Sequence, residues 1–126
     1  MKKLFLVTLM IVVSFASFGQ AEKLAVPSIG GKTNGQTISK SALVSAGKIT
    51  LNQNTKQVSF FMMSYMNKLA VVELTSNSAN LTPEMKTAIN SLPAKSKVSF
   101  LKISSTTVGN SNAAPERVGE FHVTIQ

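Results

Sequence analysis

The sequence predicts a mostly β protein, a small β-sandwich with one short helix at about 83–92 and a helical turn at about 40–46. Three observations indicate this fold class. Short apolar and alternating segments follow one another along the chain, and turn-forming residues separate them. One of these segments instead has a clear helix start. The length of 126 residues fits one small domain and not two.

The N-terminal segment, residues 1–21, is predicted to be a secretory signal peptide. Two lysines follow the first methionine, residues 4–15 are almost entirely apolar, and small residues come next. A membrane anchor is the alternative, but this apolar run has about a dozen residues and a membrane span needs about 20. We expect cleavage after Gly19 or Ala21, which leaves residues 22–126 as a single domain without a membrane span.

The expected mature chain is exported, either to the periplasm or beyond it. It is not a lipoprotein, because the sequence has no Cys that could carry a lipid. Loss of the two N-terminal lysines leaves 11 basic against 5 acidic residues, so the net charge falls from +8 to about +6. The lysines are scattered and not interleaved with aromatic residues, so we expect no nucleic-acid partner. A basic surface suits anionic envelope polymers or an acidic partner, although solubility alone would also explain it.

The first third of the mature chain contains short elements. Residues 26–29 and 37–38 predict two short strands on either side of a glycine-rich turn. The helical turn at 40–46 follows, because a serine on either side of Lys40 can cap it and Gly47 suits a left-handed residue after its last turn. This helix is too short to be stable alone, so it must pack on the rest of the fold.

The next three strands come close together. Residues 48–51 predict a short strand, and residues 58–66 are the most β-like part of the chain. Residues 69–75 predict the returning strand, and Asn67 and Lys68 are expected to form the two-residue turn of a hairpin.

A helix is predicted over residues 83–92. Thr82 can cap its first turn, Pro83 occupies a position where its missing N–H costs nothing, and Glu84 lies at the positive end of the helix dipole. Apolar residues then recur at helical spacing, at Met85, Ile89 and Leu92.

Two strands are predicted after the helix, at 97–104 and 118–126, with a long loop over 106–117 between them. In the first strand Val98 and Phe100 share a face, whereas Ile103 has the opposite parity. A β-bulge near Leu101 and Lys102 would explain this change.

The strand at 58–66 is apolar on both faces, which a sandwich does not require. We assign one face to the core, together with the apolar faces of the neighbouring strands: Val58, Phe60, Met62, Ala70, Val72, Leu74, Val98, Phe100, Phe121, Val123 and Ile125. The other face consists of Phe61, Met63 and Tyr65. The helix at 83–92 could cover it, or it could be an exposed surface for a partner. We take Phe61, Met63 and Tyr65 as the candidate partner surface.

The residue inventory argues against an enzyme. His122 is the only histidine, and no Cys or Asp is present, so a catalytic triad with Asp and a thiolate metal site are excluded. His122 and Glu120 share the solvent-facing side of the last strand in this prediction. We therefore predict no catalytic residue, no metal ligand and no cofactor.

Three stretches in this order resemble a known family. Residues 26–47 contain Gly-Gly-Lys-Thr, Ile-Ser-Lys-Ser-Ala-Leu and a closing Ala-Gly; residues 75–89 contain Thr-Ser-Asn and Leu-Thr-Pro-Glu-Met-Lys; residues 96–103 contain Ser-Lys-Val-Ser-Phe. Together they resemble the C-terminal domain of the gliding-motility and type IX secretion motor protein GldM of Bacteroidota. We expect the domain here to stand alone behind the signal peptide.

This resemblance implies an immunoglobulin-like fold and a non-enzymatic role. It also implies a protein partner in the cell envelope, a component of the motor or of the secretion system, and self-association is a further option. A different class of function remains open from the residues themselves. Phe61, Met63, Tyr65 and the lysines also fit a periplasmic carrier of a hydrophobic or anionic small ligand, in which case an enclosed apolar pocket is expected instead of an open patch.

Overall fold

The computed structural model describes residues 25–109 and 114–126, so the predicted signal peptide at 1–21 lies outside the described residues. The elements within them are, in chain order, β1 (Pro27–Ile29), β2 (Gln36–Ile38), α2 (Lys40–Ala46), β3 (Ile49–Leu51), β4 (Lys56–Asn67), β5 (Ala70–Ser76), α3 (Pro83–Ser91), β6 (Lys97–Thr107) and β7 (Glu116–Ile125). The prediction of a mostly β chain with a short helix and a helical turn is confirmed.

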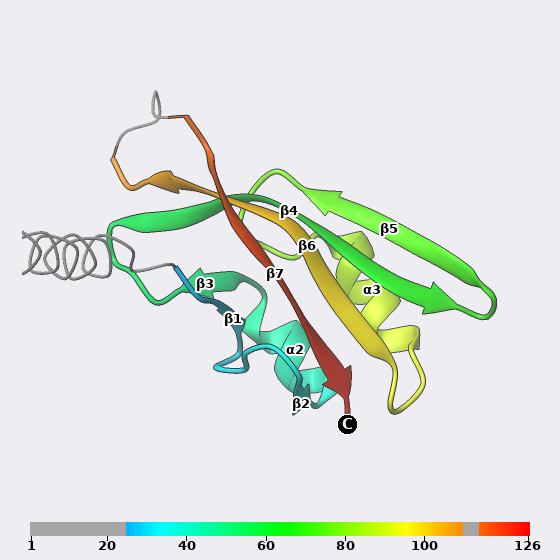
Figure 1. Cartoon of the computed structure of the whole chain (residues 1–126). Coiled ribbons are helices and arrows are strands. Elements are labelled where there is room, and N and C mark those ends of the chain that lie inside the picture. Colours follow the sequence, from blue (N-terminus) through cyan, green and yellow to red (C-terminus); the bar gives the residue numbers. More distant parts are fainter. Residues whose placement is uncertain (1–24, 110–113) are drawn as a thin grey trace, which may run out of the picture.

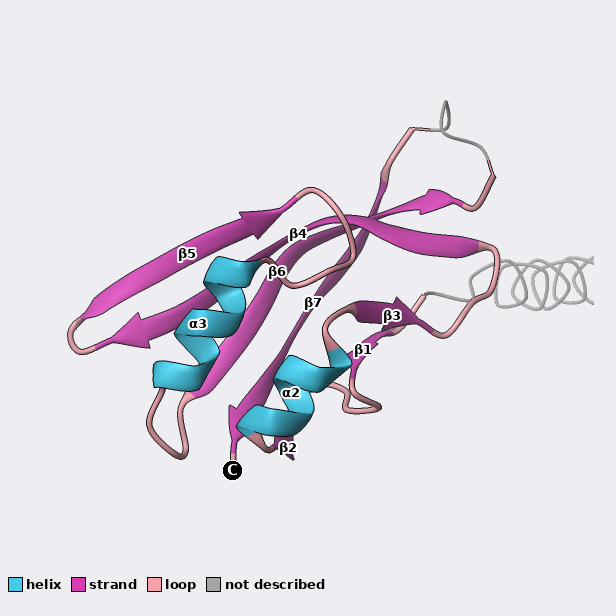
Figure 2. Cartoon of the chain, turned by 180° about the vertical axis from the view of Figure 1, so that it is seen from behind, coloured by secondary structure: helices cyan, strands magenta, loops and turns pink. Residues whose placement is uncertain are grey.

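The strands form two open sheets in a sandwich-like arrangement. The larger sheet has the order β2-β7-β6-β4-β5, and β1 pairs with β3 in a small second sheet. Both helices lie on the same side of the larger sheet, behind it in Figure 1 and in front of it in Figure 2. In the part of the chain that the structure describes, no helix or strand covers the opposite side, which we call the open face.

The second layer of this sandwich is partly helical. An immunoglobulin-type sandwich divides seven strands into sheets of four and three. Here the described strands divide five and two, and α2 and α3 complete the layer opposite the larger sheet (Figure 2). The helices therefore bury much of the apolar face that a larger second sheet would otherwise bury.

Both helices have the caps that the sequence predicts. The Ser39 hydroxyl accepts a hydrogen bond from the Ala42 N–H at 3.1 Å, and Gly47 ends α2 in the left-handed conformation. The Thr82 hydroxyl accepts from the Met85 N–H at 3.2 Å, next to Pro83 in the first turn of α3. Because these side chains satisfy N–H groups that have no partner within the helix, they fix where each helix begins.

A single core lies between the larger sheet and the second layer. Three aromatic rings stand in its centre: Phe61 meets Phe100 edge to face at a centroid distance of 5.9 Å, and Phe100 stacks on Phe121 at 5.0 Å. Leu43 of α2 and Ile89 of α3 belong to the same cluster of buried side chains. The two helices are thus held by apolar contacts to the sheet and not by charge.

The predicted face of β4 is wrong at Phe60 and Met62. The register of β4 against β6 shifts twice, between Val58 and Phe60 and between Phe60 and Met62. As a result Val58, Phe61 and Met63 are buried on the helix side, whereas Phe60 and Met62 are only half-buried. The bulge predicted in β6 is confirmed, since its register shifts between Phe100 and Ile103 and both residues are fully buried.

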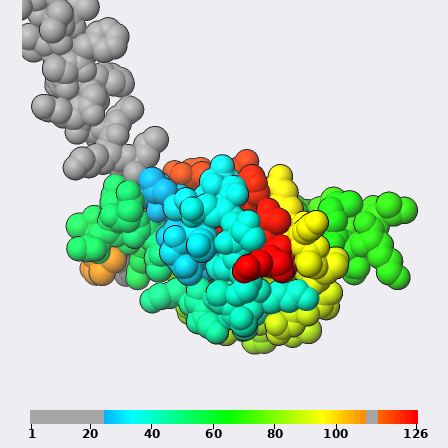
Figure 3. Space-filling model, turned by 90° about the horizontal axis from the view of Figure 1, so that it is seen from below, coloured from blue at the N-terminus to red at the C-terminus, as the bar shows by residue number. Residues whose placement is uncertain are grey.

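The hairpin turn is one residue later than predicted. Asn67 pairs with Ala70, so Lys68 and Leu69 form the two-residue turn, and Lys68 has a positive φ of 59°. A turn of this length needs such backbone angles, which normally favour Asn or Gly. The shift extends β4 to Asn67, and Figure 3 shows the β4–β5 hairpin in green, projecting beyond the rest of the described chain.

Candidate functional site

Two of the three residues predicted to form the partner surface are in the core. Phe61 and Met63 are completely buried, in the same cluster as Met85 and Ile89 of α3. The prediction of a partner surface is therefore wrong for Phe61 and Met63, because the two register shifts turn them toward the helices. The alternative, that a helix covers this face, is correct for both residues. Only Tyr65 is partly accessible, at the margin of the core.

Exposed apolar side chains instead gather at the end of the β4–β5 hairpin. Met66 is 53% exposed, Val71 is 62% exposed and Leu69 in the turn is 97% exposed. Met66 and Val71 are direct partners in the β4–β5 register and so lie side by side on the open face of the sheet. We call Met66, Leu69 and Val71 the apolar tip.

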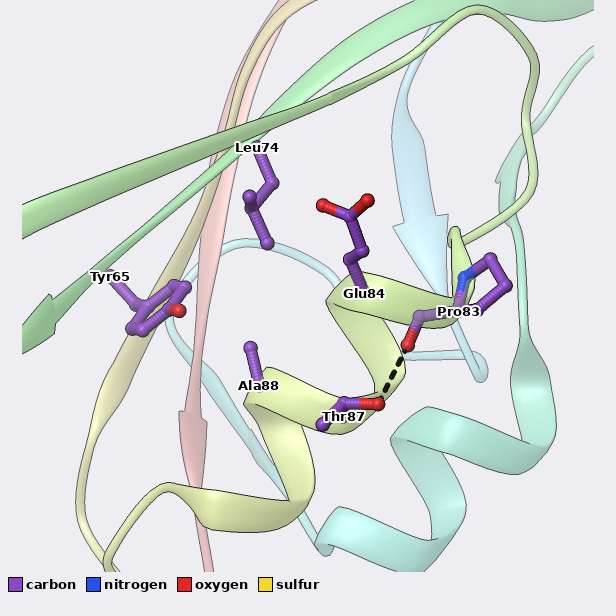
Figure 4. Close-up of a pocket in the computed structure, with 6 residues that line it drawn as sticks. All are labelled: Tyr65, Leu74, Pro83, Glu84, Thr87 and Ala88. Atoms are coloured by element: carbon purple, nitrogen blue, oxygen red, sulfur yellow. Dashed lines mark hydrogen bonds between the residues drawn. The ribbon is translucent and has the colours of Figure 1, made fainter.

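An apolar groove lies on the helix side of the hairpin, the face opposite to Met66 and Val71. It has a volume of about 450 Å³, is open to solvent, and is lined by Tyr65, Leu74, Pro83, Glu84, Thr87 and Ala88. In Figure 4 Tyr65 and Leu74 from the hairpin face α3, which supplies the other four side chains. The Thr87 hydroxyl donates to the Pro83 carbonyl at 3.0 Å, so helix backbone already satisfies it. Glu84 is the only charged residue of the lining.

Little in the sequence indicates this groove. The sequence predicts Leu74 on the core face of its strand and Pro83 and Glu84 at the start of a helix, and the structure agrees. The proximity of Leu74 to Pro83 and Glu84 depends on how α3 crosses the sheet, and a local sequence pattern does not predict that crossing. Leu69 and Val71 are a usable signal, because a large apolar residue lies in the hairpin turn and another follows two residues later.

The open face carries a polar hollow around His122. Its lining residues include Asn34, Lys97, Ser99 and Glu120, and its volume is about 340 Å³. Ser99 lies directly opposite His122 in the β6–β7 register. Within the described residues, however, the hydrogen bonds at His122 reach only its backbone, from Gly35 and to Asn34. A nucleophile needs a base and an orienting group in hydrogen-bond contact, and this arrangement does not supply them.

Metal binding finds no support in residues 25–109 and 114–126, where no group of three or more His, Cys, Asp or Glu side chains comes together. The described ion pair joins Lys56 to Glu116, at the end of β4 that is opposite to the hairpin turn. It is partly exposed and so contributes little to stability.

Comparison with known proteins does not identify the chain. No protein-family model matches it, and no curated protein is similar enough to count as a match. Of the helices that the structure describes, none is long and apolar enough to cross a membrane.

Proposed function

We propose that this chain is an exported, non-enzymatic protein-interaction module of the bacterial cell envelope. The observation that carries the proposal is the projecting β4–β5 hairpin, which has the exposed side chains of Met66, Leu69 and Val71 and, on its helix side, an open apolar groove. Exposed apolar surface of this kind costs free energy in water, and contact with another protein recovers it. Signal-peptide export of residues 22–126, and lack of a lipid anchor, belong to the same proposal.

The cellular system is proposed from the sequence resemblance. The three stretches at 26–47, 75–89 and 96–103 resemble the C-terminal domain of GldM, so we propose a link to gliding motility or type IX secretion in Bacteroidota. The partner would then be a protein of the motor or of the secretion machinery. A sandwich-like fold with a projecting hairpin is compatible with such a docking role.

A pull-down with matched variants tests both statements. The protein is immobilised and exposed to envelope extracts of a gliding Bacteroidota species, and bound proteins are identified by mass spectrometry. We expect a motor or secretion component to be recovered. The double variant Leu69→Ser/Val71→Ser should lose it, because both side chains are exposed and their replacement leaves the core unchanged. Recovery of no such component counts against the proposed system.

The matched control is Val108→Ser. Val108 is 51% exposed, like the apolar tip, but it follows β6 at the opposite end of the sheet, where Thr107 pairs with Lys56. This variant should recover the same partner as the unmodified protein. Equal loss of the partner in both variants would show that general surface hydrophobicity, and not the hairpin, causes the binding.

A carrier of a small ligand is the second candidate, and the groove beside Tyr65 is the observation that favours it. The groove fits a hydrophobic ligand better than an anionic one, because Glu84 is its only charged residue and no lysine lines it. Native mass spectrometry of the protein purified from its source would decide this point. A bound apolar molecule would support the carrier, and its displacement by Ala88→Phe would locate it in the groove.

A further inference from the structure

The free edge of β5 is a second feature of the projecting hairpin. β5 ends the order β2-β7-β6-β4-β5, so one side of it pairs with β4 and the other has no described strand. Along an antiparallel ladder, hydrogen-bonded pairs of residues alternate with non-hydrogen-bonded pairs. A two-residue turn is flanked by a hydrogen-bonded pair, which here is Asn67 and Ala70. The N–H and C=O groups of Val71, Glu73 and Thr75 therefore point to the free edge. An unpaired edge of this length is a template for another strand.

Carboxylates flank this edge on both sides of the sheet. Glu73 is exposed on the open face of β5, and Glu84 is exposed at the groove on the helix side. The described residues contain only four carboxylates against ten Lys and Arg side chains, so two of the four lie beside β5. Lys68 is the nearest cation along β5, about 16 Å from Glu73 for five extended residues. Across the sheet, Glu73 lies opposite Ser64 and Ser64 opposite Ser99, so Lys97 is about 12 Å from Glu73 on the open face. Glu73 is thus the charged residue of the free edge itself, and the lysines are set back from it.

We propose that β5 accepts an extended, basic segment of a partner protein as a sixth strand of the sheet. This inference rests on the proposed function and names the way in which the partner is recognised. Side chains of an added strand alternate between the two faces. We expect apolar side chains on the helix side, beside Leu74 and Pro83 at the groove, and Lys or Arg on the open face, beside Glu73.

A second copy of this chain fits the edge less well than a basic segment. The antiparallel register that pairs all the free groups of both copies sets Val71 against Thr75 and Glu73 against its own equivalent. Like charges directly opposite one another are destabilising.

A proline substitution separates strand addition from side-chain contact. The Thr75 N–H points to the free edge, so Thr75→Pro removes a donor for the added strand while it leaves the hydrogen bonds to β4 in place. Thr75→Ala is the matched control, because it removes the same side chain and keeps the N–H. Circular dichroism of both variants checks that the sheet remains folded.

The probe is a blocked peptide of sequence Thr-Val-Lys-Val-Lys-Val-Thr, and fluorescence anisotropy with the purified protein measures its binding. We expect it to bind at least tenfold more tightly than the same peptide with Glu in place of Lys. Glu73→Lys should remove this preference. Thr75→Pro should weaken binding tenfold or more, and Thr75→Ala should bind like the unmodified protein.

Each other outcome overturns strand addition. Equal binding by Thr75→Pro and Thr75→Ala would show that the edge groups are not used, although a partner recovered through Leu69 and Val71 in the pull-down would leave the proposed function intact. A dimer in sedimentation velocity that Thr75→Pro dissociates would assign the edge to a second copy instead. Should Thr75→Pro fail to fold, N-methylation of alternate peptide amides makes the same test, and binding that survives in both methylation registers overturns the proposal.

Discussion

Replacement of Phe100 by Ala is expected to lower the free energy of unfolding by about 3–5 kcal/mol, the usual range for an aromatic residue in a core. Phe100 is completely buried and touches two other rings, Phe61 edge to face and Phe121 in a stack. Its removal therefore leaves a cavity in the middle of the aromatic row. A domain of this size has a total stability of about 5–15 kcal/mol, so the variant would be close to unfolding at ambient temperature.

Urea denaturation followed by circular dichroism measures this loss, and Phe60→Ala is its control. Phe60 is an aromatic residue of β4 that is only half-buried on the open face, so its loss should be much smaller. Comparable losses in the two variants would mean that the open face is as well packed as the core. That outcome would contradict the burial of Phe100 and the single-core description of the fold.

The contrast between Phe60 and Phe61 also shows the limit of sequence reading in β4. Alternation identifies the buried face of a strand only when the other face is polar. In residues 58–66 both faces are apolar, so a bulge leaves no trace in the pattern. In β6 the polar neighbours of Val98, Phe100 and Ile103 made the same kind of irregularity visible, and the predicted bulge is present.

The helices were easier to predict, because their ends are chemically marked. Thr82 and Pro83 define the beginning of α3, and Ser39 and Gly47 define the limits of α2. Each signal acts within one turn of backbone and needs no tertiary information. Placement of the helices on the sheet is different, since it depends on which strand faces point inward. Hence the groove between α3 and the hairpin could not be predicted.

The proposed docking surface lies in the part of the molecule that the sequence pattern predicts least well. The predicted surface at Phe61 and Met63 is core, and the exposed apolar residues are at the tip and edge of the same hairpin. An error of one residue in a strand exchanges its two faces, so a correct strand can carry a wrong site. Tyr65 alone connects the predicted surface with the groove that the structure shows.

Replacement of Leu43 by Ala is expected to lower the free energy of unfolding by about 2–5 kcal/mol, because α2 loses its one fully buried side chain. Leu43 is completely buried and is the buried residue of α2. A helix of seven residues is unstable in water by itself, so its packing decides whether it forms. We expect the variant to lose α2 together with the contacts that hold β1 and β2, before the rest of the sheet unfolds.

Hydrogen exchange resolved by residue measures this local loss, alongside urea denaturation for the total. Amides of α2 should exchange much faster in Leu43→Ala, whereas those of β4 and β6 should keep most of their protection. Val44→Ala is the matched control, because Val44 is a half-buried neighbour in the same helix and Ala favours helix. If Val44→Ala destabilises as strongly as Leu43→Ala, the inward face of α2 is not the one that Leu43 defines. If Leu43→Ala leaves the exchange of α2 unchanged, the helix is held by something other than its apolar anchor.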